Sequence, residues 1–312
     1  MPLFAIQNKK LSTVAQGNFQ FEKELQQLIE ANLETAFSCR FVASEFSTGA
    51  QHAGRIDTLA LSEDNNPVII EYKKVESSEL INQSLYYLAW IYDHRGDFEL
   101  MVKKKLGQEA EVDWSDVRVI CLAPSFKKFD LYAAQMMPTN IELWTYRLYQ
   151  NDCFYFEQVL QPSYAGPGGE SEPQKNPVMV AAGKKAAITK ATGTYDFEEH
   201  LDYAGSAELK ELATAIQDFI LKLDPKIEEA PKKNYVAYRT SQNIVCMEIM
   251  KQKIVLFLKL NPKLVTGPPG ISRDVSELGH YGTGDLEITI HSAADFELAK
   301  PFIVQAYQAV GA

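Results

Sequence analysis

The chain has 312 residues, of which 46% are hydrophobic and 23% are charged, and its formal net charge is −10. These values predict a globular protein of two ordinary domains. They exclude a membrane-spanning helix, because no apolar run approaches the roughly 20 residues that such a helix needs. The negative net charge also argues against binding of nucleic acid through overall positive charge. A nucleic acid would therefore have to bind at local clusters of lysine residues.

Cysteine and histidine residues form no recognisable metal or redox motif. The four cysteines lie far apart without a C-x-x-C pair, which indicates reduced structural residues. The five histidines lack metal-ligand spacing, and no G-x-x-x-x-G-K-[ST] loop is present, which argues against a nucleotide-driven motor. The first residues, MPLFAIQNKK, lack the layout of a secretory signal, so a cytoplasmic location is expected.

Residues 1–160 are expected to form the first domain. Apolar residues at helical spacing predict a helix over Gln20–Phe37. The elements predicted after it are, in chain order, a strand over Arg40–Ser47, two strands within Gly54–Lys74, one long helix or a broken pair over Ser77–Leu106, a strand over Val117–Ala123, a short helix over Lys127–Met137, and strands over 141–149 and 153–160. The order is α-β-β-β-α-β with a hairpin appended.

The two strands within Gly54–Lys74 carry acidic residues where buried strands usually carry apolar ones. Alternate side chains of a strand share a face, so Asp57 lies on the face of Leu59 and Glu71 on the face of Ile69. Both faces of both strands are mostly apolar, which predicts the centre of a sheet that is covered on both sides. Burying a carboxylate there costs several kcal/mol unless it is paired or binds a cation.

Asp57 followed by Glu71-Tyr72-Lys73 resembles the signature of the PD-(D/E)XK nuclease superfamily, with Ile56 at a position that varies in the superfamily. Together with the order of elements, the motif is similar to a restriction-endonuclease-like core over about residues 20–160. The resemblance implies an α/β (α+β) fold with a mixed sheet and flanking helices. The alternative explanation of the spacing alone is a salt-bridged aspartate and a Glu–Lys pair at a strand end.

The resemblance also implies a role for each residue of the motif. Asp57, Glu71 and the backbone carbonyl of Tyr72 would ligate Mg²⁺ or Mn²⁺, for which oxygen ligands are suited. Lys73 would position or activate the attacking water and stabilise charge on the phosphate.

Many members of the superfamily add a glutamate from the first helix. At about 100° per residue, Glu22 falls roughly 50° from the centre of the apolar stripe and Glu24 roughly 110° away, which favours Glu22 as a further metal ligand. The alternative role of Glu22 is a first-turn acid that favours the helix dipole.

The RecB-like and mismatch-endonuclease-like branches carry a glutamine and, one turn later, a tyrosine on the next helix. Gln83 and Tyr87 have this spacing and share a helix face. Gln83 would orient a water or a metal ligand, and Tyr87 and Lys74 would contact nucleic acid. The alternatives are ordinary core packing for Tyr87 and a solvated strand end for Lys74.

A change of composition separates the second domain from the first. Residues 161–194 are rich in Gly, Pro, Ser, Lys and Ala, which predicts a flexible linker. Residues 195–312 are typical of a small α+β domain with an antiparallel sheet. The expected elements are an amphipathic helix over Ala207–Leu223, strands over 235–240, 243–250, 253–260 and 285–290, and a final helix over Asp295–Val310. The stretch LKLNPK and the loop GHYGTGDLE (Gly279–Glu287) resemble a domain of unknown function, DUF5655, that occurs fused to predicted nucleases.

The function predicted from these resemblances is a divalent-metal-dependent nuclease that cleaves DNA rather than RNA. The C-terminal domain would recognise the substrate or a partner, which includes a second copy of the chain. The alternative is a catalytically silent module that binds nucleic acid or protein on the same fold.

Overall fold

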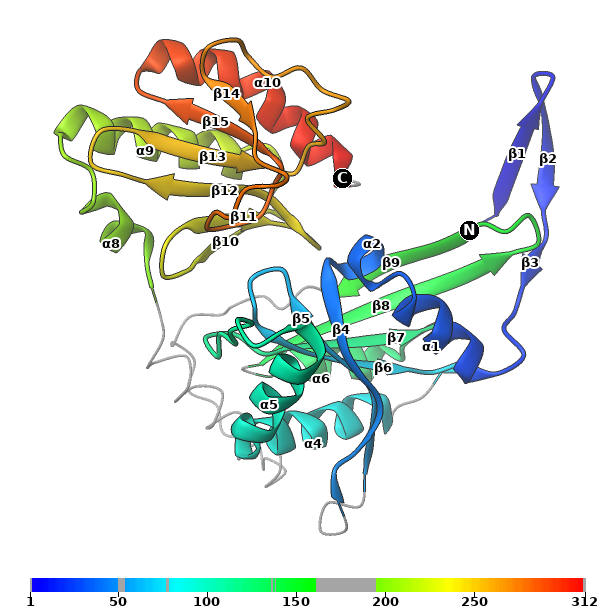
Figure 1. Ribbon diagram of the computed structural model, residues 1–312. Helices are drawn as coiled ribbons and strands as arrows, with labels where there is room; N and C mark the ends of the chain where they lie inside the picture. The colour runs from blue at the N-terminus through cyan, green and yellow to red at the C-terminus, as the bar shows by residue number, and fades with distance from the viewer. Residues whose placement is uncertain are drawn as a thin grey trace. The chain divides into compact units, whose positions relative to one another are not determined.

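The computed structural model describes residues 2–49, 54–76, 79–135, 137, 139–160 and 195–310. The chain divides into two compact units, Met1–Gly193 and Thr194–Ala312 (Figure 1). The predicted linker, residues 161–194, lies outside the described residues. Within the described ranges, no helix is long and apolar enough to cross a membrane.

The first unit is a mixed sheet with helices on both of its faces (Figure 1). Its elements are β1 (Leu3–Gln7), β2 (Lys10–Val14), β3 (Gln16–Gly17), α1 (Glu22–Glu30), α2 (Leu33–Phe37), β4 (Cys39–Ser47), β5 (Arg55–Ser62), β6 (Pro67–Tyr72), α4 (Glu79–Asp93), α5 (Arg95–Leu106), β7 (Arg118–Ala123), α6 (Lys128–Gln135), β8 (Asn140–Tyr149) and β9 (Phe154–Leu160).

The strands of the main sheet have the order β3-β8-β7-β6-β5-β4, and β9 pairs with β8. Antiparallel pairing joins β4, β5 and β6, whereas parallel pairing joins β6, β7 and β8. The parallel step from β6 to β7 needs a crossover connection, which α4 and α5 provide. The predicted mixed sheet with flanking helices and the α-β-β-β-α-β order are therefore confirmed.

Apolar cores cover both faces of this sheet. Leu59 and Ile69 pack with α4 and α5 on one face, and Ile70 and Tyr72 pack with α1 and α2 on the other. Every side chain of β6 and β7 is consequently buried, including the carboxylate-bearing side chain of Glu71. This double coverage is what the near-continuous apolar sequence of these strands predicts.

A buried ion pair shows how this sheet accommodates charge. Arg118 at the start of β7 donates two hydrogen bonds to Glu142 on β8, over 2.8 and 3.2 Å. The indole N–H of Trp144 donates a further bond of 3.0 Å to the same carboxylate. A buried charge is thus fully matched here, as burial requires.

Two predicted helices are each broken in the structure. The helix over Gln20–Phe37 is two helices, α1 and α2, because Asn32 leaves the helical region at φ −130° and donates from its side chain to the Leu28 carbonyl. For the segment over Ser77–Leu106, the alternative of a broken pair is the correct one, since α4 and α5 are separated at His94.

An N-terminal hairpin precedes the sheet and was not predicted from the sequence. Strands β1 and β2 pair antiparallel with Gln7 opposite Lys10, which leaves Asn8 and Lys9 as a two-residue turn. Both turn residues have positive φ, at 52° and 63°. This is the geometry of a type I′ turn, which matches the twist of a hairpin.

The second unit is an antiparallel sheet with helices packed on one face (Figure 1). The strand order is β10-β11-β12-β13-β15-β14, and a smaller core lies on the other face. The predicted α+β domain is confirmed. Its elements are α8 (Phe197–Leu201), α9 (Ala207–Leu221), β10 (Glu228–Pro231), β11 (Val236–Arg239), β12 (Asn243–Ile249), β13 (Ile254–Leu258), β14 (Ser272–Asp274), β15 (Leu286–Ile290) and α10 (Ala293–Ala309).

Candidate metal and catalytic site

The register of β5 and β6 places two acidic residues opposite each other. Thr58 pairs with Ile70 in the antiparallel ladder, so the next residues along, Asp57 and Glu71, face one another where the two strands approach their ends. Glu71 is buried and Asp57 is half-buried. The side chains lie on the sheet face that α4 covers, as the alternation of the two strands predicts.

Backbone hydrogen bonds hold both carboxylates in place. The N–H of Asp57 donates to Glu71 Oε1 over 3.1 Å, and the N–H of Tyr72 donates to Asp57 Oδ2 over 3.1 Å. Among the described residues, neither carboxylate has a cationic side chain within ion-pair distance. The salt-bridged aspartate and Glu–Lys pair of the alternative explanation are therefore not formed by Asp57 and Glu71 among these residues, in contrast with the buried Arg118–Glu142 pair.

Burial and mutual repulsion make it costly to ionise both acids. Burial is the main cause that raises the pKa of Glu71 to about 9, and the charge of Asp57 adds to this effect. Burial also raises the pKa of Asp57, opposed chiefly by the hydrogen bond from Tyr72 and by the charge of Lys73. A cation stabilises the ionised form of such a pair, in which a buried and a half-buried carboxylate are adjacent.

Lys73 follows the second strand and contacts the first helix. Its ammonium lies 3.4 Å from Glu22 Oε1, and the backbone N–H of Lys74 donates to Glu22 Oε2 over 2.9 Å. The Tyr146 hydroxyl donates to the Lys73 carbonyl over 3.4 Å. The structure thus brings Glu22 to the strand end that carries the motif, where its carboxylate is bound to the lysine.

Glu24 has a different position. Its carboxylate accepts hydrogen bonds from the backbone N–H groups of Gln20, over 2.7 Å, and Phe21, over 3.2 Å. These are unsatisfied donors at the start of α1, so Glu24 caps the helix. The helical-wheel choice of Glu22 over Glu24 agrees with this placement.

Gln83 and Tyr87 lie one turn apart on α4. The Oε1 atom of Gln83 is buried and has no hydrogen-bond partner within the part of the chain that the structure describes. The Tyr87 hydroxyl accepts a bond from the backbone N–H of Arg55 over 3.3 Å, and the charges of Glu71 and Asp57 help to raise its pKa after burial. Tyr87 is thus both packed in the core and close to the acid pair.

A glycine makes room for the tyrosine. A Cβ atom on Gly54 would lie 2.7 Å from Tyr87 Cε1, which is closer than real side chains approach. The start of β5 therefore lies directly against the ring, and this close approach fixes the first motif strand to α4.

A buried polar network on α1 was missed in the sequence. The side-chain amide of Gln26 donates to the Asp57 carbonyl over 2.8 Å and to Glu30 Oε1 over 2.9 Å. Glu30 also accepts from the Thr58 hydroxyl over 2.6 Å, and Thr58 accepts from the Tyr72 hydroxyl over 3.2 Å. The signal was present, because Gln26 lies one helical turn after Glu22 and shares its face.

Basic side chains flank the acid pair. Glu45 on β4 binds both Lys23, over 2.9 Å, and Arg55, over 2.5 Å. The hydrogen bond from Lys23 is the main cause that lowers the pKa of Glu45. The negative charge of Glu45 in turn helps to raise the pKa of Asp57. The site thus has an acidic centre with a partly exposed basic border.

The oxygen atoms at the site are of the kind that bind a divalent cation. No group of three or more His, Cys, Asp or Glu side chains is arranged for metal binding among the residues described. Asp57 and Glu71 nevertheless supply two adjacent carboxylates without an ion-pair partner among these residues, and Gln83 on α4 has a buried Oε1 atom without a hydrogen-bond partner there. Hard oxygen donors of this kind suit Mg²⁺ or Mn²⁺.

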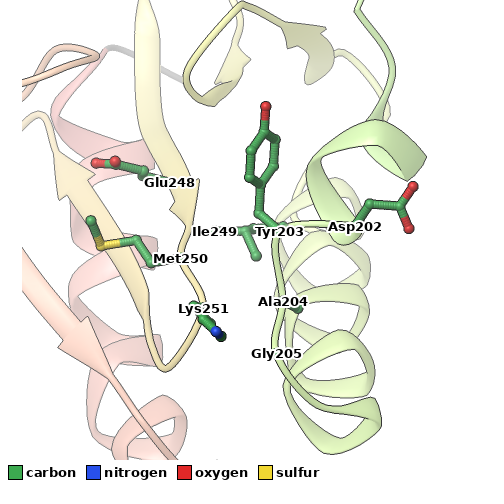
Figure 2. A pocket seen from close by; sticks show the side chains of 8 residues that line it. All are labelled: Asp202, Tyr203, Ala204, Gly205, Glu248, Ile249, Met250 and Lys251. Carbon is green, nitrogen blue, oxygen red and sulfur yellow. The ribbon is translucent and has the colours of Figure 1, made fainter.

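The second unit has a separate surface hollow of about 530 Å³ between the end of α8 and the β12–β13 turn. Figure 2 shows Tyr203 on one side and Glu248 on the other. A Cβ atom on Gly205 would lie 2.4 Å from the Lys251 carbonyl, so a glycine is needed for the close approach of these two segments. The hollow is wide and open, and its side chains do not converge on one point.

Comparison with known proteins gives matches for both parts of the chain. The profile "Domain of unknown function (DUF5655)" matches residues 199–310, which confirms the predicted C-terminal domain. A Haemophilus influenzae protein described as uncharacterized is 31% identical over 311 residues, which cover 98% of this chain and 99% of that protein.

Two solved structures have partial similarity. They are an EndoMS–dsDNA2 complex, with 20% identity and a TM-score of 0.30, and a repair endonuclease from Pyrococcus abyssi, with 17% identity and a TM-score of 0.26. The matches cover 45% and 48% of this chain, and 48% and 50% of the respective structures. TM-scores of this size do not establish a common fold.

Proposed function

The chain belongs to the same family as the uncharacterized Haemophilus influenzae protein, which it matches over nearly its whole length, and we propose that this protein is a divalent-metal-dependent nuclease. The reaction is hydrolysis of phosphodiester bonds, in DNA rather than RNA. The C-terminal unit would recognise the substrate or a partner.

The observation that carries this proposal is the pair Asp57–Glu71. Glu71 is buried and Asp57 is half-buried, and the two face each other on neighbouring strands. Neither has a cationic partner among the described residues, although the buried Arg118 and Glu142 of the same sheet form an ion pair. Ionising both acids in this arrangement costs free energy, since burial raises the pKa of Glu71 to about 9, and acids with strongly shifted pKa values cluster at functional sites. A bound cation removes that cost.

The residues present would divide the work as follows. Asp57, Glu71 and the Tyr72 carbonyl would hold Mg²⁺ or Mn²⁺, which supplies Lewis acidity and lowers the pKa of a bound water. Lys73 would stabilise charge that develops on the phosphate. Glu22 holds the Lys73 ammonium at 3.4 Å, so it acts through the lysine and would be a metal ligand only after that contact breaks.

The substrate contacts in this proposal come from the border of the site. Tyr87 and Lys74 would contact the nucleic acid. Lys23 and Arg55 would bind phosphates of the substrate after their ion pairs with Glu45 break. Gln83 would orient a water or a ligand through its free Oε1 atom.

Cleavage of labelled DNA by the full chain tests the proposal. Wild type is expected to cleave with Mn²⁺ or Mg²⁺ and not with EDTA, and Asp57→Asn is expected to be inactive. Glu109→Gln, an exposed acid in the same unit, is the matched control and should retain full activity. The alternative, a silent binding module, predicts metal-independent binding of nucleic acid and no cleavage by the wild type.

A further inference from the structure

The β1–β2 hairpin, residues Leu3–Val14, forms an arm that stands away from the main sheet of the first unit (Figure 1). Its strands pair only with each other in the part of the chain that the structure describes. Phe4, Ile6 and Leu11 are 45%, 76% and 68% exposed, and none belongs to a core cluster. A two-stranded hairpin of this kind is marginally stable in water, so a surface that covers it would stabilise it.

The register places the exposed apolar side chains on one face of the arm. Ile6 lies opposite Leu11 and Phe4 lies opposite Thr13. Because successive residues alternate between faces, these four side chains form one stripe along the ribbon. The stripe is narrow and continues to within one residue of the turn.

The charge of the arm is opposite to that of the rest of the unit. Residues 1–21 contain two lysines, Lys9 and Lys10, and no acidic residue, whereas residues 22–160 contain 13 basic and 22 acidic residues. The type I′ turn places Lys9 at the tip, in a positive-φ position that usually favours glycine. The tip is therefore a local cationic point on an acidic protein.

Strand β3 and a short loop connect the arm to the candidate site. β3 ends at Gly17, and α1 begins five residues later at Glu22. The Lys74 ammonium donates to the Gln20 carbonyl over 2.5 Å, which ties this connection to the residue that follows Lys73. The base of the arm, where β3 pairs with β8, is thus tied to the strand end that carries the motif.

We propose that the β1–β2 arm binds duplex DNA by entering its major groove beside the cleavage site. This proposal rests on the proposed nuclease function and specifies its substrate as a B-form duplex. The major groove of B-DNA admits a two-stranded β-ribbon, whereas the deep and narrow major groove of A-form RNA does not admit side chains. Lys9 and Lys10 contact phosphates, and the stripe of Phe4, Ile6 and Leu11 contacts sugars and thymine methyl groups.

A second copy of the chain is the other candidate to cover the arm. A stable protein interface buries about 800 Å² per partner from some 20–30 residues. The arm has two strands of five residues and a two-residue turn, so it is too small to form such an interface alone. Its basic tip, in contrast, complements a polyanion directly.

Binding in EDTA separates this proposal from catalysis. The full chain is titrated into a labelled 30-base-pair DNA duplex, the matching RNA duplex and the matching single strand, at several salt concentrations. Lys9→Gln/Lys10→Gln is expected to weaken duplex DNA binding by at least about tenfold and to reduce the slope of log K against log salt by about 1.8, the value for two phosphate contacts. Ile6→Ser/Leu11→Ser should weaken binding and leave this slope unchanged.

Lys103→Gln/Lys104→Gln, a pair of exposed lysines on α5, is the matched control and should change neither quantity. Duplex DNA binding by the wild type that survives both arm substitutions with the same slope overturns the arm proposal and leaves the nuclease proposal intact. No binding of any nucleic acid by the wild type overturns the arm proposal, and the nuclease proposal is then decided by the cleavage assay with Mn²⁺. A dimer in light scattering that Ile6→Ser/Leu11→Ser converts to a monomer, with DNA binding unchanged, assigns the arm to a second copy instead.

Discussion

Asp57 and Glu71 are linked through backbone as well as through space, because the N–H of Asp57 donates to the Glu71 carboxylate while the N–H after Glu71 donates to the Asp57 carboxylate. Each acid is therefore oriented by the strand of the other. A change at either position is expected to affect the cation site without loss of the strand pairing that carries it.

Lys73→Met separates catalysis from folding. The substitution keeps most of the side-chain volume and removes the charge, so metal-dependent cleavage should fall by about 10²–10³, the effect of losing one transition-state charge contact. The unfolding free energy should change by about 1 kcal/mol or less, because the lost pair with Glu22 is partly exposed. Cleavage assays and thermal melts measure the two effects, and an unchanged cleavage rate would contradict the assigned role.

Asp57→Asn is expected to abolish stabilisation by Mn²⁺. In the wild type, a ligand at 100 times its Kd adds about 2.7 kcal/mol to the unfolding free energy, which raises the melting temperature. The variant keeps the hydrogen bond from Tyr72 to its side-chain oxygen but loses one anionic ligand. Calorimetric titration and melts with and without millimolar Mn²⁺ test this, with Glu109→Gln as control. A wild-type melting temperature indifferent to Mn²⁺ would argue strongly against the metal site.

Glu71→Gln should alter the pH dependence of stability without metal. The pKa of Glu71 is raised to about 9 in the folded chain from an ordinary value of 4.5. Folding thus favours the protonated form, so this contribution to stability is complete below pH 4.5 and is lost as pH rises toward 9. At pH 7 the variant should be more stable than wild type by on the order of 3 kcal/mol, at 1.36 kcal/mol per pH unit, with little difference below pH 4.5.

Urea titrations of wild type and Glu71→Gln between pH 4 and pH 9 measure this difference in unfolding free energy. Glu142→Gln serves as a comparison, because it breaks the ion pair with Arg118 and should lower the unfolding free energy instead. Equal pH profiles for wild type and Glu71→Gln would show that Glu71 ionises normally. Addition of Mn²⁺ should flatten the wild-type profile, since cation binding favours the ionised acid and releases a proton.

Gly54→Ala should destabilise the first unit through Tyr87. The new methyl group would lie 2.7 Å from the tyrosine ring, so the ring or the start of β5 must move, at a cost of about 1–3 kcal/mol. Tyr87→Ala removes the obstacle, and the effect of Gly54→Ala measured in that background should be much smaller. Additive effects in the double-mutant cycle would show that the two residues are not coupled.

The sequence predicted the features of the first unit that follow from long apolar periodicity. The central strands were found because β5, β6 and β7 carry apolar residues on both faces, and the acids in them stood out for that reason. The helical wheel also favoured Glu22, which the structure brings to Lys73. The ion pair between the Glu22 carboxylate and Lys73, and its distance, depend on tertiary contacts, and a helical wheel carries no information about these.

The elements that escaped prediction have weak local signals. Among the residues that the structure describes, the β1–β2 arm belongs to no core cluster, and its turn is Asn-Lys rather than the usual Asn-Gly. Strands β10 and β14 are short and rich in charged or half-exposed residues, so they show no apolar alternation. Gln26 escaped because a buried glutamine is recognised only from its acceptors, which lie on two other strands.

The parallel pairing of β6 with β7 sets the order in which the protein assembles during synthesis. Val68 pairs with Arg118, and at about 5–20 residues per second the ribosome needs several seconds to make the chain between them. Strands β4, β5 and β6 can form their antiparallel ladder earlier, because their partners are close in sequence. Until β7 docks, Glu71 therefore lies in a strand with an open edge, and the burial that raises its pKa in the folded chain is incomplete. Pulse-labelled hydrogen exchange during refolding should show β5 amides protected before the β6 amides that face β7.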